Sequence, residues 1–149
     1  MPTQTQATFD QLCNDAIADQ SRAVAALRTY FGRRADGERV YTGSVFDTWA
    51  GGGDSTETAD IITADDFVAL SFLSRKLPGR VQLELLGRRS ADLSRLLGQL
   101  PTDVDLWGAE ESHLESAGNA WRIVEGLPGV GWVTAGKLLA RKRPRLIPV

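Results

Sequence analysis

The stretch from Leu127 to Leu139, which reads LPGVGWVTAGKLL, decides how the rest of the chain is interpreted. Pro128 predicts the end of a helix, because proline lacks an N–H and restricts the residue before it. Gly129 and Gly131 have no Cβ, so they accept positive φ and let another backbone approach closely. From Val130 onward the apolar residues return at helical spacing. The stretch therefore predicts two helices joined by a tight turn that contains two glycines.

The start of a helix after such a turn is a natural site for an anion. Its first N–H groups have no partner within the helix, and the helix dipole adds partial positive charge there. Phosphate is the anion that such a turn suits best. The predicted phosphate-binding amides are those of Gly129, Val130, Gly131 and Trp132.

Side chains after the turn extend this predicted site. Thr134 offers a hydroxyl group, and Lys137 and Arg141 lie four residues apart, on one face of the second helix. Both basic groups would flank the phosphate; the alternative is that they are solvated charges near a helix C-terminus. The ring of Trp132 would stack on nucleic acid, or else pack half-buried against the protein. We predict nucleic-acid contact for all four side chains.

The same residues resemble the helix-hairpin-helix motif of DNA repair proteins, in the LPGVG..TA form of the helix-hairpin-helix DNA glycosylases. The resemblance begins at Ile123 and is most specific at the turn itself, followed by Thr134, Ala135 and a Leu-Leu pair. It implies a motif at about residues 112–142 that contacts the DNA backbone through its amides. It also implies a monovalent cation at hairpin carbonyls, which here are those of Glu125, Leu127 and Val130. The whole chain resembles an uncharacterised bacterial family that carries this hairpin near its end.

The resemblance also implies catalytic groups that this chain lacks. Bifunctional glycosylases have a nucleophilic lysine inside the motif, where this sequence has Val133. The glycosylases also need an aspartate after the hairpin, at about the place where this sequence ends in Val149. Because valine neither transfers protons nor stabilises positive charge, we expect no intact catalytic site and no cofactor apart from that cation. A shortened form of a glycosylase-like enzyme is a further interpretation.

Composition narrows the class of protein. The 149 residues are 42% hydrophobic and 24% charged, which is typical of one globular domain, here residues 1–149. No apolar run is long enough to span a membrane and no signal peptide pattern is present, so we expect a cytoplasmic protein without a membrane partner. The single cysteine, Cys13, and the single histidine, His113, exclude a Cys/His zinc site within one chain. We expect Cys13 to be a small core residue.

Charge is distributed unevenly along the sequence. Residues 1–126 contain twelve basic and nineteen acidic side chains, whereas the end of the chain has five basic residues and no acidic one. An acidic body repels nucleic acid, so we expect weak, salt-dependent DNA binding that is confined to the basic end. The alternative is a protein-interaction module whose hairpin is purely structural and whose acidic and basic parts bind a partner or a second copy.

Hydrophobic spacing predicts an all-α fold, a helical bundle with the helix-hairpin-helix at its C-terminal end. Acidic residues after Thr63 and near Ser112 are explained as helix N-terminal caps. No strand pattern or internal repeat is present. The expected helical segments are 8–31, 44–49, 63–74, 81–86, 91–100, 102–107, 112–125 and 134–141.

Overall fold

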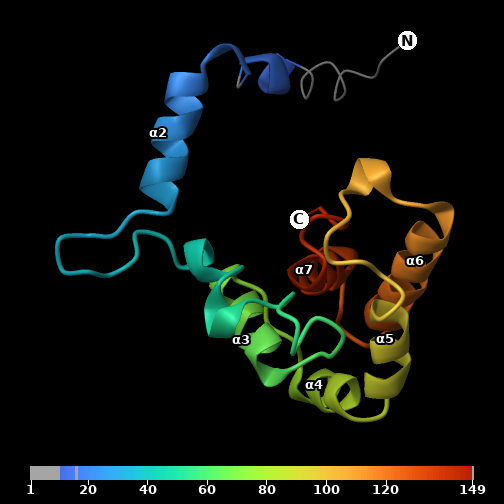
Figure 1. Cartoon of the computed structure of the whole chain (residues 1–149). Coiled ribbons are helices and arrows are strands. Elements are labelled where there is room, and N and C mark those ends of the chain that lie inside the picture. Colours follow the sequence, from blue (N-terminus) through green and yellow to red (C-terminus); the bar gives the residue numbers. More distant parts are fainter. Residues whose placement is uncertain (1–10, 16, 149) are drawn as a thin grey trace. The chain divides into compact units, whose positions relative to one another are not determined.

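The computed structural model describes residues 11–15 and 17–148 (Figure 1). These residues form helices, turns and loops, and their one β-type pairing is an isolated antiparallel bridge between Arg33 and Arg39. The all-helical prediction is confirmed for this part of the chain. Contacts between residues group the chain into two compact units, Met1–Ser44 and Val45–Val149. The single domain expected from the sequence stays a prediction.

The first unit is built around helix α2 (Gln20–Tyr30). A single helix over 8–31 was predicted, but the chain turns at Asp19, whose carboxylate accepts the N–H of Arg22 at 3.0 Å and caps α2. Aspartate competes for backbone N–H groups in this way, which favours a helix start over a helix interior. The first three residues of that predicted helix, 8–10, lie outside the described residues. Cys13 is exposed, so the prediction that it is a core residue was wrong.

The second unit is a cluster of short helices around α7, which lies in its middle (Figure 1). Helix α7 packs against α3 and α6, while α4 and α5 pack against each other, α4 also against α3 and α5 also against α6. Within the described residues, no helix has both the length and the apolar character needed to cross a bilayer. The helices in chain order are η1 (Thr42–Val45, at the boundary between the units), η2 (Trp49–Gly51), α3 (Ala64–Phe72), α4 (Gly79–Leu86), α5 (Ser90–Leu97), η3 (Leu106–Gly108), α6 (Glu111–Glu125) and α7 (Trp132–Lys142).

Leucines from several helices form the centre of this unit. They recur at the helical spacing that buries one face of each helix. Predicted and observed helices agree to within a few residues from residue 63 onward, because these apolar faces are strongly periodic. The fully buried apolar residues include Leu70, Leu85, Leu93, Leu97, Val124, Leu138 and Leu139.

In the second unit, the starts of α3 and α6 have side-chain caps, one of them at a different residue from the one predicted. Helix α3 has the predicted capping box, in which Asp66 accepts the N–H of Thr63 at 2.7 Å. Helix α6 begins earlier than predicted: Glu110, not Ser112, is its N-cap residue, and the N–H of Glu110 donates to Nδ1 of His113 at 3.2 Å. The lone histidine therefore has a structural partner at a helix start.

A glycine lets α6 and α7 approach closely. A Cβ on Gly136 of α7 would lie 2.6 Å from Cη2 of Trp121 on α6, well inside van der Waals contact. The indole of Trp121 thus packs directly on the backbone of α7. By contrast, a Cβ on Gly118 of α6 would meet no atom within 4 Å.

This difference predicts opposite effects of two glycine-to-alanine substitutions. Gly136→Ala should lower the free energy of unfolding by about 1–3 kcal/mol, because the added methyl group collides with the Trp121 ring. Gly118→Ala should raise it by about 0.5–1 kcal/mol, because alanine is the better helix former and has room there. Urea denaturation monitored by circular dichroism measures both. An unchanged or more stable Gly136→Ala protein would contradict the packing described.

Candidate nucleic-acid interface

The turn between α6 and α7 is set by a proline and a glycine. The N–H of Val130 donates to the carbonyl of Leu127 at 3.0 Å, and Gly129 between them has φ +81°. Proline at the second position and a positive-φ residue at the third match a type II turn. Only a residue such as glycine adopts this φ without strain, so local sequence determines the turn.

Several amides after this turn lack an acceptor. Among the described residues, none accepts the N–H groups of Gly129, Gly131, Trp132 or Val133, whereas that of Thr134 already donates to Gly131 at 3.0 Å. Gly129, Gly131 and Trp132 are exposed, so these groups face solvent. Val130 departs from the prediction: its N–H closes the turn and its side chain is buried. The predicted phosphate site therefore loses one of its four amides.

The start of a second helix lies beside this turn. A Cβ on Gly129 would be 3.3 Å from Cγ of Pro78, the N-cap residue of α4. Together Pro78, Arg80 and Pro128 help to line a small cavity of about 150 Å³. The N–H groups of Gly79 and Arg80 also have no acceptor among the described residues, so free amides of two helix starts lie on one exposed surface. Sequence reasoning missed Arg80, because no local pattern connects residue 80 with the turn.

The predicted side chains around the turn have different surroundings. The indole of Trp132 is 67% exposed, so it does not pack half-buried against the protein. Thr134 and Lys137 are partly exposed on α7. No ion pair involves Lys137 within the described part of the chain. These three side chains remain candidates for ligand contact.

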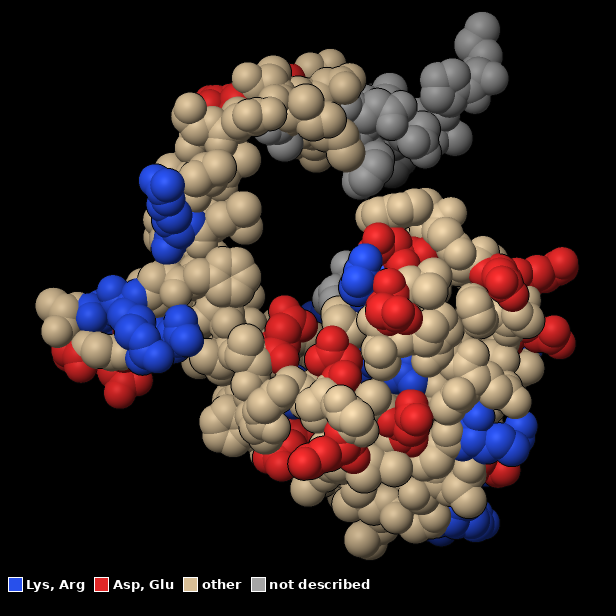
Figure 2. Space-filling view, viewed as in Figure 1, with Lys and Arg blue, Asp and Glu red and all other residues tan. Residues whose placement is uncertain are grey.

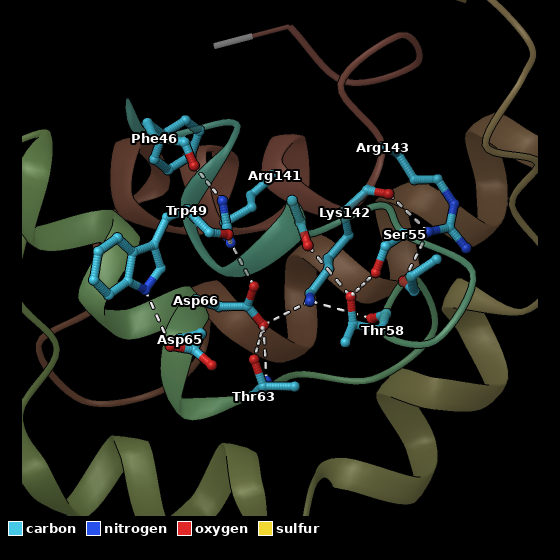
Figure 3. Close-up of polar contacts among 12 residues, drawn as sticks. Phe46, Trp49, Ser55, Thr58, Thr63, Asp65, Asp66, Arg141, Lys142 and Arg143 are labelled. Atoms are coloured by element: carbon cyan, nitrogen blue, oxygen red, sulfur yellow. Dashed lines mark hydrogen bonds and ion pairs between the residues drawn. The ribbon is translucent and has the colours of Figure 1, made fainter. Parts of the chain in front are cut away.

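Arg141 is not on the surface, which corrects its predicted place beside a phosphate. Its side chain is 1% exposed, and its Nε lies 2.9 Å from Oδ1 of Asp66, which is also 1% exposed. Its guanidinium also donates to the carbonyls of Phe46 and Trp49 (Figure 3). A buried charge needs such partners, and all of them come from sequence positions far from residue 141. The Arg141 guanidinium therefore bonds groups inside the protein and is not available to a ligand at the surface.

The two residues after Arg141 are buried as well. The Lys142 ammonium lies 2.6 Å from Oδ2 of Asp66 and donates to the carbonyl of Thr58 at 3.2 Å. Arg143 points away from Asp66 (Figure 3) and donates to Asp60 at 2.5 Å, to the carbonyl of Leu100 at 2.7 Å and to that of Ala59 at 2.8 Å. The basic end, which was predicted to face DNA, is thus mostly an internal ion network.

The network affects the protonation of Lys142. Burial lowers the pKa of its ammonium group below the ordinary value of 10.5. The carboxylate of Asp66 opposes this by stabilising the charged form, and the neighbouring Arg141 and Arg143 favour loss of the proton. Asp66 thus stabilises the charged form of the buried Lys142 side chain.

The surface charge of the second unit differs from the sequence-based expectation. Of the five basic residues after Gly131, three are buried, and Arg145 forms a two-bond pair with Asp105, with both distances 2.9 Å. This pairing lowers the pKa of the Asp105 carboxyl and raises that of Arg145. Figure 2 shows carboxylates gathered over the middle of the face that it draws. Within the described part of the chain, Lys137 is thus the one basic residue after Gly131 without an ion pair.

Comparison with known proteins shows the family of the chain. Residues 23–149 match the family of unknown function DUF6308, and the chain belongs to that family. No curated protein and no solved structure matches it.

The ion network makes a prediction about Asp66. Asp66→Asn should lower the free energy of unfolding by about 3–5 kcal/mol, because it leaves Arg141 and Lys142 buried without an anion. Asp65→Asn is the matched control: the neighbouring carboxylate is exposed and accepts only the indole N–H of Trp49 at 3.0 Å, so stability should change little. Equal effects of the two substitutions in urea denaturation would refute the central role of Asp66.

A second substitution tests the pKa of Lys142. In the native protein this pKa lies below 10.5, so as the pH rises toward 10.5 the unfolded chain retains a proton that the native protein has lost. The stability of the wild type should therefore rise with pH relative to Lys142→Met, which cannot titrate there. Urea denaturation of both proteins over this pH range measures the difference. A constant or falling difference would contradict the direction of the shift.

Proposed function

We propose that this DUF6308 member binds the sugar-phosphate backbone of DNA, without reading base sequence, through a helix-hairpin-helix formed by α6, the turn at 127–131 and α7. The observation that carries the proposal is the set of exposed, unpaired amides at the turn. Backbone N–H groups at a helix start hold phosphate oxygens by hydrogen bonds, assisted by the helix dipole. Such contacts position a protein on nucleic acid without specifying sequence.

Arg80 takes the place that was predicted for Arg141 in this proposal. It lies at the first turn of α4, which packs beside the hairpin turn, and it is exposed. Lys137 on α7 supplies the second cation and Thr134 a hydroxyl. With so few cations and a carboxylate-rich body, binding should be weak, and its salt dependence should reflect the small number of phosphates that are neutralised. The cation at the carbonyls of Glu125, Leu127 and Val130 stays a prediction; the Leu127 carbonyl already accepts the N–H of Val130.

Gly131→Val tests the amide contacts without disturbing the fold. Gly131 has an ordinary φ of −86° and a Cβ there would meet nothing within 4 Å, so valine fits the free protein. A bound phosphate, however, would collide with the side chain. We expect loss of duplex binding in fluorescence anisotropy and an unchanged thermal unfolding curve. Undiminished binding by Gly131→Val would remove the basis of the proposal.

Arg80→Ala tests the added cation. It should weaken binding about equally for all DNA sequences and reduce the slope of log affinity against log salt concentration by about one. Arg88→Ala is the matched control, because Arg88 is exposed beyond the other end of α4 and pairs with Glu84 at 2.7 Å. The same slope for both variants would show that Arg80 makes no phosphate contact.

One observation favours a second candidate function, self-association through α2. Val24, Leu27 and Phe31 are exposed along one face, and no residue of α2 is buried. An isolated helix shorter than about 12–15 residues is marginal in water, so α2 gains stability from a partner that covers this face. The protein-interaction alternative thus rests on α2. The basic end, mostly buried, is not available to pair with a partner.

Leu27→Asp tests this candidate. The wild type should have a mass above the 16.2 kDa of one chain in size-exclusion chromatography with light scattering, and the variant should be monomeric. Thr29→Asp adds the same charge about 200° away around the helix, so it should leave the mass unchanged. A monomeric wild type at every concentration tested would exclude self-association.

A further inference from the structure

Trp132 differs from the tryptophans that pack within the fold. Trp121 lies against Gly136, and the ring of Trp49 packs edge-on against Phe72 with 5.2 Å between centroids. Trp132 has no ring partner among the described residues, and its indole is two-thirds exposed. The exposed indole of Trp132 therefore presents an aromatic face that a ligand at the turn can contact.

The position of this ring connects it to the proposed phosphate site. Trp132 is the first residue of α7, and its own N–H is one of the amides without an acceptor. The exposed Gly131 precedes it, so the residue between Trp132 and the Pro128–Gly129 turn's last residue, Val130, has no side chain. A nucleotide whose phosphate is held by these amides therefore has its base or sugar within reach of the indole.

We infer that the ligand of this site is DNA with unpaired bases, one of which stacks on Trp132. This inference rests on the proposed function and names its substrate class. In an intact duplex both faces of each base are covered by its neighbours, so stacking on Trp132 requires a base to leave the helix, which costs a few kcal/mol. An unpaired base does not carry that cost, and stacking on an aromatic ring tolerates any base because each has a π-face.

The test compares three oligonucleotides in fluorescence anisotropy: a single strand, a perfect duplex and a duplex with a single-stranded overhang. The wild type should bind the single strand and the overhang more tightly than the perfect duplex. Trp132→Ala should lose about 5- to 150-fold in affinity for the single strand, as expected for one stacked base, and keep its duplex affinity. Trp132→Phe, which retains an aromatic face, should recover part of the loss.

Trp107→Ala is the matched control, because Trp107 is 87% exposed on η3, away from the turn in sequence. It should bind all three oligonucleotides like the wild type, and thermal unfolding should show that each variant is folded. Equal losses for single strand and duplex in Trp132→Ala, or no loss, would overturn the inference. If Gly131→Val abolishes binding while Trp132→Ala changes nothing, the backbone proposal stands and the stacking inference fails. If the wild type binds none of the oligonucleotides, both fail.

Discussion

The second unit depends on the buried ion pairs that the Asp66 carboxylate forms with Arg141 and Lys142. This carboxylate sits at the first turn of α3 and meets Arg141 and Lys142 from the last turn of α7 (Figure 3), with all three side chains at 1% exposure or less. Because an unpaired buried charge is very costly, the two helices are held in one arrangement relative to each other. The same two cations donate hydrogen bonds to the carbonyls of Phe46, Trp49 and Thr58. These bonds connect the segment before α3 to the end of α7.

This network also explains the electrostatics of the proposed interface. Four of the five basic residues at the end of the chain are paired with carboxylates, so they add little long-range field that attracts nucleic acid. The groups at the exposed start of α7 can make only short-range contacts. They are the unpaired amides, the Trp132 ring and the neighbouring helix start with Arg80. A site of this kind selects by geometry and stacking, and its contacts act only once a phosphate is close.

The two units contribute different physical properties. The second unit buries an extensive leucine core, whereas α2 in the first unit buries none of its residues. The backbone-binding proposal rests on the second unit and the self-association proposal on the first. The two proposals can therefore be tested independently of each other. The break at Asp19 separates α2 from the preceding helical residues and leaves it a helix of 11 residues.

Local sequence was sufficient for the helices from residue 63 onward, for the capping box of α3 and for the turn at Pro128 and Gly129, because these depend on residues within about one helical turn of each other. Local sequence was insufficient to predict which charged side chains are buried and which stay at the surface. Helical spacing placed Arg141 beside Lys137 but carried no information about Asp66, which is 75 residues away. Likewise, only packing brought Arg80 next to the turn. The sequence by itself determined that a helix follows a glycine-containing turn at 127–131, although it placed the start of that helix two residues late and counted the Val130 amide as free. The tertiary structure decided which cations remain at the surface, because burial and pairing of a charge depend on residues distant in the chain.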